Sequence, residues 1–302
     1  MGNSHSHWDA GMPELLKRTA RGVAIGALRR NEADAAAEVM ARSFAGSGTV
    51  IGEPCFEWAF GATSGDPSGG EYEETRLTAM RWYLKWAFLI CERHGVVAGA
   101  KDATTGRLLG VLCALPPAQL HRTTTSPLLR PHVLRTAMLI GGPPPSKPAG
   151  SATRMDEVGK LMHMVRKRGA KKGKPTWLVW ILAVDANAQG AGVGGALLDA
   201  FHWLVDAASE DAWLETNGDR NVAFYTKQGY STAVPSTPLS AALGKRKASR
   251  LAPRAAGTGA CTTTGEREVP PQGDYPGEAP PEAELRLSGM RRTHGPRAES
   301  TS

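Results

Sequence analysis

The chain has 302 residues, 41% of them hydrophobic, and this is enough apolar chain to bury a globular core. Its 35 Gly and 21 Pro predict long loops or disordered segments in addition. The formal net charge is +7, but the run 166–174 carries six Lys/Arg by itself. The remaining charge predicts no broad basic face, which argues against a nucleic-acid partner.

The N-terminus is the one place where the sequence suggests a membrane. Gly2 and Ser6 fit the N-myristoylation pattern, and Lys17, Arg18 and Arg21 could add the electrostatic signal that a single acyl chain needs. A chance match in a polar tail is the alternative. No apolar run approaches the roughly 20 residues of a membrane span. The four cysteines lack C-x-x-C spacing and read as reduced thiols. We therefore expect a cytoplasmic protein, with peripheral membrane contact through acylated Gly2 left open.

Hydrophobic periodicity predicts one α/β domain of the α+β type over residues 21–293, with tails at 1–20 and 294–302 and a disordered insert at 239–281. The segment 47–70 reads as loop, although its aromatic side chains should pack against the core. The expected elements, in chain order, are a strand over 22–28, helices over 31–44 and 71–93, a hairpin of 96–100 with 108–115, helices over 126–141 and 151–168, a strand over 177–184, a helix over 193–208, a strand over 212–216, a helix over 221–228, and strands over 230–234 and 284–292.

A glycine turn at 190–195 follows the most apolar strand and admits two interpretations. It contains a literal G-x-G-x-x-G with Glu215 some twenty residues later, which is the dinucleotide-binding pattern. However, Asp185–Gln189 separate the strand from the first glycine, and the chain beyond Tyr230 is too poor in strands and helices for the rest of a doubly wound sheet. A nicotinamide-dependent oxidoreductase is therefore a distant third hypothesis.

The second interpretation starts one residue earlier, at Gln189, as Gln-x-x-Gly192-x-Gly194. This frame resembles the acetyl-CoA pyrophosphate loop of the GNAT acetyltransferases. The segment Leu214–Tyr230, with Leu-Glu-Thr, Arg-Asn and Phe-Tyr-x-x-x-Gly-Tyr, resembles the strand and helix that close the GNAT cofactor site, nearest to the puromycin N-acetyltransferase-like branch. The resemblance implies a mixed central sheet flanked by helices, with the cofactor in the cleft between two central parallel strands.

Residues of the cofactor site follow from the turn and from the resemblance. Glycines between a strand end and a helix start let backbone N–H groups approach a phosphate, which the positive end of the helix also favours. The resemblance implies that the strand end pairs with the pantetheine arm, and that an N–H near Val184 faces the thioester oxygen. The candidate cofactor-binding residues are Leu182, Ala183, Val184, Gln189, Gly190, Ala191, Gly192, Val193, Gly194, Gly195 and Asn221.

Two side chains are candidates for the chemistry. Tyr225 occupies the motif position that in GNAT enzymes commonly protonates the leaving thiolate, although a half-buried tyrosine is common in any helix. Glu215 is the candidate base for the incoming ammonium, as the resemblance implies for the glutamate of Leu-Glu-Thr. A solvated strand-end carboxylate, a partner of Arg220 and a base role for a water chain stay open. The eight histidines show no metal-site spacing.

These residues predict an N-acetyltransferase that moves an acetyl group directly from acetyl-CoA to a primary amine of a small molecule. A non-catalytic CoA-binding module, or a membrane-tethered adaptor built around Gly2, is the alternative from another class. The identity of the acceptor depends on the loops at 45–70 and 116–150, whose conformation the sequence does not dictate.

Overall fold

The structure is a computed structural model, which describes residues 19–20, 22–45, 52–61, 70–119, 136–142, 147–148, 150–169, 174–239 and 285–293. Several expectations lie outside these residues: residues 1–18 of the predicted N-terminal tail with Gly2, the tail at 294–302, most of the predicted helix at 126–141, residues 170–173 of the basic run, and the insert beyond Leu239. The end of the predicted N-terminal tail is not a tail, because Thr19–Ala20 form a short strand.

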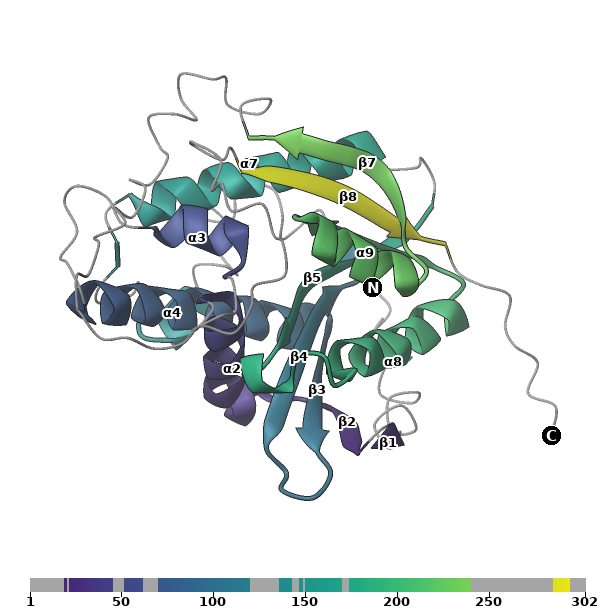
Figure 1. Ribbon diagram of the computed structural model, residues 1–302, viewed down its shortest axis with the longest axis horizontal. Coiled ribbons are helices and arrows are strands. Elements are labelled where there is room, and N and C mark those ends of the chain that lie inside the picture. The colour runs from purple at the N-terminus through teal and green to yellow at the C-terminus, as the bar shows by residue number, and fades with distance from the viewer. Residues whose placement is uncertain are drawn as a thin grey trace, which may run out of the picture.

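The described strands form one eight-stranded sheet in the order β1-β2-β3-β4-β5-β6-β8-β7 (Figure 1). The strands are β1 (Thr19–Ala20), β2 (Val23–Ala27), β3 (Val96–Asp102), β4 (Leu108–Leu115), β5 (Thr176–Val184), β6 (Asp211–Thr216), β7 (Ser231–Pro238) and β8 (Arg286–Arg292). All neighbours are antiparallel except β5 and β6, which are parallel. The predicted mixed sheet with two central parallel strands is confirmed. A doubly wound dinucleotide fold would instead require a mostly parallel sheet.

Helices cover both faces of the sheet and create two apolar cores (Figure 1). The first core lies under α2 (Ala33–Ala45), α3 (Pro54–Phe60), α4 (Gly70–His94) and α7 (Ser151–Gly169), and the second lies under α8 (Val193–Ala207) and, at its edge, α9 (Asp219–Lys227). Trp177 of β5 is fully buried in the second core and Trp213 of β6 is almost fully buried in the first. Burial on both faces explains the unbroken apolar run of β5. None of the described helices has the length and apolar character needed to cross a membrane.

The segment 47–70, expected to be rich in loop, contains the short helix α3, which the sequence did not predict. Pro54 occupies the first turn of this short helix, where its missing N–H costs nothing, and the Glu53 carboxylate caps the helix by accepting from the Phe56 N–H at 2.9 Å. The predicted packing of the aromatic residues is confirmed, because Phe56, Trp58 and Phe60 are buried. Seven residues are too few for a clear helical period, so the pattern was not readable as a helix.

The parallel strands β5 and β6 pair only at their beginnings, through three partner positions that end at Leu178 and Trp213. Further along, β5 stays on β4 as far as Val184, whereas β6 stays on β8 as far as Thr216. The β4–β5 register shifts between Cys113 and Ala114, so β5 carries one extra residue at this point. Such a bulge bends and twists a strand. The two parallel strands therefore diverge, and a V-shaped opening forms between their carboxyl ends.

The last strand comes from the far side of the predicted insert. β8 lies between β6 and β7 and is antiparallel to both, so the expected strands over 230–234 and 284–292 pair with each other. Gly289 of β8 lies opposite Glu215, and a Cβ there would come within 2.5 Å of Trp213 Cζ2. Glycine is thus needed for the Trp213 indole to lie across this strand.

The central position of β8 predicts a large effect from truncating its buried side chain. Met290 is fully buried, and Met290→Ala should lower the free energy of unfolding by about 2–5 kcal/mol because it leaves a cavity. Arg286→Ala, at an exposed position of the same strand, should cost less than about 1 kcal/mol. Urea unfolding of both variants provides the measurement. Equal, small effects would mean that β8 is not part of the folded core.

Candidate active site

The glycine turn joins the end of β5 to α8, and its backbone explains its composition. Gly190 and Gly192 have φ angles of 80° and 84°, in the left-handed region that favours glycine. Gly192 is the N-cap of α8. The helical hydrogen bonds begin with the Ala196 N–H, which donates to the Gly192 carbonyl at 3.0 Å. The helix geometry leaves the N–H groups of Val193, Gly194 and Gly195 free for a ligand.

Gly194 and Gly195 lie close to α9. A Cβ on Gly194 would lie 3.4 Å from the Phe224 ring, and one on Gly195 would lie 3.4 Å from the Gln228 side chain. Both neighbours belong to α9 or its C-cap. These are ordinary van der Waals distances, so α9 packs against the first turn of α8 and closes one side of the turn.

The edge of β5 that faces the V-shaped opening is unpaired near its end. The Asp185 N–H donates to the Leu109 carbonyl at 2.8 Å, so residue 185 points toward β4. Peptide groups of alternate residues point to opposite sides of a strand, so those of Leu182 and Val184 point into the opening and that of Ala183 points toward β4. The Gln189 side chain donates to the Val184 carbonyl at 3.4 Å, in agreement with this direction.

Glu215 lies at the end of β6 and is held by two side chains. Arg166 of α7 donates to its two carboxylate oxygens at 2.8 and 2.9 Å, and the Trp213 indole N–H donates to one of them at 2.6 Å. The Glu215 side chain is 4% exposed. Its ion-pair partner is therefore Arg166 and not Arg220, and an ammonium ion would have to compete with a two-point guanidinium contact to reach it.

Tyr225 lies on α9, on the other side of the opening. Its ring packs edge-on against Phe224 and Tyr230, with ring centroids 5.0 and 5.8 Å apart. Burial raises the pKa of Tyr225 above its usual value, and the nearby charge of Glu53 raises it further. The phenol therefore stays protonated at any physiological pH. Asn221, in the first half of the same helix, is exposed, and α9 starts from Gly218 without a side-chain cap.

Sequence reasoning missed two residues, Glu53 and Asn217. They are 164 positions apart and are joined by a hydrogen bond from the Asn217 amide to the Glu53 carboxylate. The same amide nitrogen lies 3.5 Å from the Cys55 sulfur. Asn217 directly follows β6 and Glu53 directly precedes α3. The only sequence signals are the Glu-Pro start of a helix and the position of Asn217 just beyond Leu-Glu-Thr.

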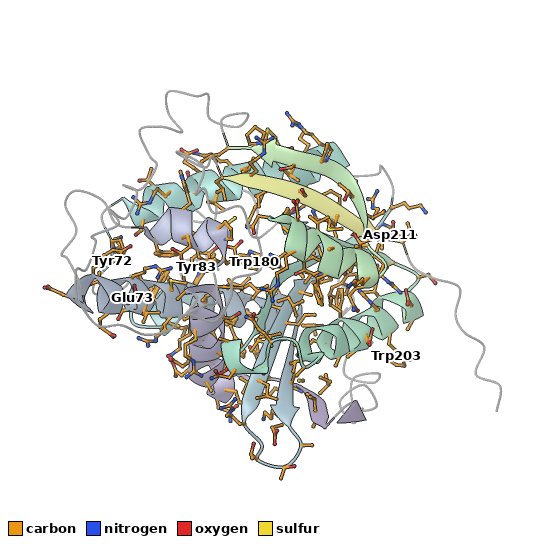
Figure 2. All side chains as sticks on the ribbon, viewed as in Figure 1. Tyr72, Glu73, Tyr83, Trp180, Trp203 and Asp211 are labelled. Atoms are coloured by element: carbon orange, nitrogen blue, oxygen red, sulfur yellow. The ribbon has the colours of Figure 1, made fainter. Side chains whose placement is uncertain are left out.

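Aromatic rings line the side of the molecule that holds Glu53. Phe44 stacks on Phe56 at 4.8 Å, Phe56 contacts Tyr83 at 5.9 Å, and Tyr83 contacts Trp86 at 5.6 Å. Trp86 in turn meets Trp180, on the bulged part of β5, at 5.9 Å. Figure 2 shows Tyr83 and Trp180 in the layer between α3 and α4. The rings therefore extend from the bulge of β5 to the start of α3.

The predicted residues thus separate into two groups around one opening. The glycine turn, the free edge of β5 and Tyr225 belong to the α8/α9 face, whereas Glu215 belongs with Arg166 to the α7 face. The first group offers N–H donors and a neutral phenol, which suit a phosphate-bearing thioester. The second group, together with Glu53 and Asn217, offers carboxylates and an amide, which suit an amine.

A family model described as "Acetyltransferase (GNAT) domain" matches residues 155–232, which run from α7 through the glycine turn to the start of β7. A mycothiol acetyltransferase from Propionibacterium freudenreichii subsp. shermanii is 35% identical over 88 residues. The match covers 28% of this chain and only 28% of that protein. The resemblance to the puromycin N-acetyltransferase-like branch stays a prediction.

Solved structures with a similar arrangement include arylalkylamine N-acetyltransferase 2 from Aedes aegypti, with 13% identity, a TM-score of 0.49, and coverage of 90% of this chain and 99% of that one. Another is described as histone acetyltransferase HPA2 and related acetyltransferase from Corynebacterium glutamicum, with 14% identity, a TM-score of 0.45, and coverage of 92% and 99%.

The Arg166–Glu215 contact predicts a double-mutant result. Arg166→Met should lower the free energy of unfolding by about 3–5 kcal/mol, because it leaves a buried carboxylate without its cation. The double variant Arg166→Met/Glu215→Gln should recover a large part of this loss, because the uncompensated charge is gone. Chemical denaturation of the three proteins measures both effects. Additive losses would show that the two side chains do not interact.

Proposed function

We propose that this chain, which carries a GNAT acetyltransferase domain, transfers an acetyl group from acetyl-CoA to a primary amine of a small molecule without a covalent enzyme intermediate. The observation that carries the proposal is the glycine turn with its free N–H groups at the mouth of the opening between β5 and β6. The matched relative is named mycothiol acetyltransferase, and this supports acetyl transfer as the reaction.

Holding the acetyl donor falls to the backbone. The N–H groups of residues 193–195 and the positive end of α8 favour the pyrophosphate. Within the described part of the chain, no atom lies within 4 Å of where a Cβ of Gly190 would be. The open edge at Leu182 and Val184 is suited to pair with the amides of an extended pantetheine arm, as an added strand would. The N–H of Val184 is then a donor for the thioester oxygen.

The reaction requires one bond to form, one to break and two protons to be placed. The amine nitrogen forms a bond to the acetyl carbon, the bond from that carbon to sulfur breaks, and the sulfur leaves with the electron pair. The substrate ammonium loses one proton before attack and a second once the new bond exists. One of these returns to the departing thiolate, so the net products are the amide, the thiol and one proton.

Tyr225 is placed to act on the departing sulfur as a hydrogen-bond donor. A phenol of ordinary pKa near 10 gives its proton to a thiolate, whose conjugate acid has a pKa of roughly 8.5, at a cost of about 2 kcal/mol. Burial increases this cost, because it raises the pKa of Tyr225. Tyr225 therefore stabilises the thiolate by donating a hydrogen bond to it. Complete transfer of the phenol proton to the sulfur requires that Tyr225 take up another proton, one released by the acceptor amine.

Cys55 is the thiol on the acceptor side of the opening, and its state favours direct transfer. It is 3% exposed, and both desolvation and the neighbouring Glu53 raise the pKa of the Cys55 thiol well above its usual value. The thiolate is the nucleophilic form of cysteine. A thiol held neutral in this way is a poor acceptor for an acetyl group, so an acyl-enzyme at Cys55 is disfavoured.

Removing the Tyr225 hydroxyl should reduce turnover more than donor binding. Tyr225→Phe keeps the ring contacts with Phe224 and Tyr230, and it should lower kcat by about 10²-fold while the Kd for acetyl-CoA changes less than about threefold. Steady-state kinetics and calorimetry provide the two values. A variant that turns over at the wild-type rate would remove Tyr225 from the mechanism.

The deciding experiment is a calorimetric titration with acetyl-CoA, followed by a thiol-release assay across a panel of primary amines. Gly192→Val should weaken acetyl-CoA binding at least tenfold (about 1.4 kcal/mol), because a β-branched side chain is strained at φ 84° and covers the free N–H groups. Gly22→Val is the matched control, since Gly22 also has a positive φ, 75°, and lies in the turn before β2. Failure of the wild-type protein to bind acetyl-CoA would end the proposal. Binding without transfer would favour the non-catalytic CoA-binding module.

A further inference from the structure

We infer that Glu53 and Asn217 form the site that receives the acceptor amine, with Glu53 as the proton acceptor and the Asn217 side-chain oxygen as the group that orients the nitrogen. This inference rests on the proposed acetyl transfer and deepens it. It assigns the base to a residue other than Glu215, and it defines the acceptor as a compound that arrives as a primary ammonium ion on an apolar body.

The Asn217 oxygen is a buried hydrogen-bond acceptor without a donor. Asn217 is 5% exposed, its Oδ1 atom has no partner within the described residues, and its amide nitrogen is already directed at Glu53 and Cys55. Leaving such an oxygen unpaired costs about 1–3 kcal/mol, so buried polar atoms of this kind normally have a partner. An N–H donor from a ligand would supply it.

Glu53 is a carboxylate without a cation. Its oxygens accept from the Phe56 N–H and the Asn217 amide, and no Lys, Arg or His of the described chain forms an ion pair with it. Burial raises the pKa of Glu53, because desolvation outweighs the hydrogen bonds from Phe56, Asn217 and Cys55, which lower it. A buried charge of this kind is stabilised strongly by a counter-ion. An ammonium ion bound beside the Asn217 oxygen would be that counter-ion.

The other groups around Glu53 do not compete for this role. Cys55 and Tyr225 are held neutral by their raised pKa values, and Glu215 is paired with Arg166. Glu53 is therefore the carboxylate of this cluster that is free to take a proton. Its raised pKa also makes it a better base than an ordinary glutamate.

The position of the pair suits the geometry of transfer. Asn217 follows β6 at the mouth of the V-shaped opening. Tyr225 on the facing helix is near enough to Glu53 for the carboxylate charge to raise the pKa of its phenol. An amine bound to Glu53 and Asn217 would thus lie on the acceptor side, and the departing sulfur on the Tyr225 side. The Glu53 N–H donates to the Phe44 carbonyl at 2.8 Å, so the row of aromatic rings starts beside the amine. Apolar surroundings of this kind suit an alkyl or aryl-alkyl body.

Glu53→Gln tests the inference, because glutamine keeps the size of the side chain and an oxygen that can cap α3. Acetyl-CoA affinity should stay within about twofold, whereas kcat/KM for an amine should fall about 10²–10³-fold at pH 7. The deficit should shrink as the pH approaches the amine's own pKa near 10, because the free amine then needs no base. A variant within threefold of wild type at pH 7, with an unchanged pH profile, would overturn the inference.

Two further variants separate positioning from chemistry. Asn217→Ala should raise the KM for the amine about tenfold, as expected for a residue that orients the nitrogen. The pH dependence of kcat should persist but move to higher pH, because the amide no longer lowers the pKa of Glu53. Glu57→Gln is the matched control, because Glu57 lies on the same helix but is paired with Arg76. It should leave kcat/KM within about twofold of wild type. A loss with Glu57→Gln equal to that with Glu53→Gln would point to damage of α3.

A readout without turnover keeps this inference distinct from the proposed function. The folded protein binds the Glu53 proton more tightly than the unfolded chain, so stability falls as the pH rises from the ordinary to the raised pKa and stays lower above it. Glu53→Gln should therefore raise Tm at pH 8. Millimolar n-butylamine or 2-phenylethylamine should raise Tm of the wild type but not of the variant. A lower Tm for the variant, or equal stabilisation of both proteins by amines, would overturn the inference even if no acetyl transfer were found.

Discussion

The divergence of β5 from β6 is the constraint on which the site depends. The strands share three partner positions, and the extra residue in β5 then turns it away along β4. Without this divergence the peptide groups of Leu182 and Val184 would pair with β6, and no ligand could reach them. An open strand edge is usually a liability in a soluble protein. Here it is enclosed between helices on both faces of the sheet, which restricts it to a ligand of matching shape.

The two faces of the sheet bring different electrostatics to this opening. The α8/α9 face contributes N–H groups, a helix dipole and a neutral phenol, and all of these favour the negative charge of phosphates and of a departing thiolate. The opposite face contributes two carboxylates, the half-buried Glu53 and the almost fully buried side chain of Glu215. Arg166 forms an ion pair with Glu215 and not with Glu53. Glu53 has no such partner among the described residues, and the proposed amine site depends on this unbalanced carboxylate.

What could be predicted from the sequence was local. The apolar run of β5, the periodicity of α8 and the glycine turn depend on neighbouring residues, and each was placed to within a few positions. The partners of the polar residues were not local. Glu215 was near Arg220 in sequence but is bound by Arg166, 49 positions away, and Glu53 meets Asn217 across 164 positions. No periodic pattern encodes such contacts, because they arise only when α3 and α7 pack on the sheet.

The position of Glu215 also depends on the C-terminal strand β8, which is distant from it in sequence. Five partner positions fix the register of β6 on β8, and Gly289 gives the Trp213 indole the space from which its N–H reaches Glu215. Arg291 also pairs with the buried Asp211 at the start of β6, at 3.6 Å. A shift of one residue in this register would move Glu215 to the other face of the sheet. The positions of Glu215 and Asn217 therefore depend on residues 286–292, which reach the sheet only after the segment beyond Leu239.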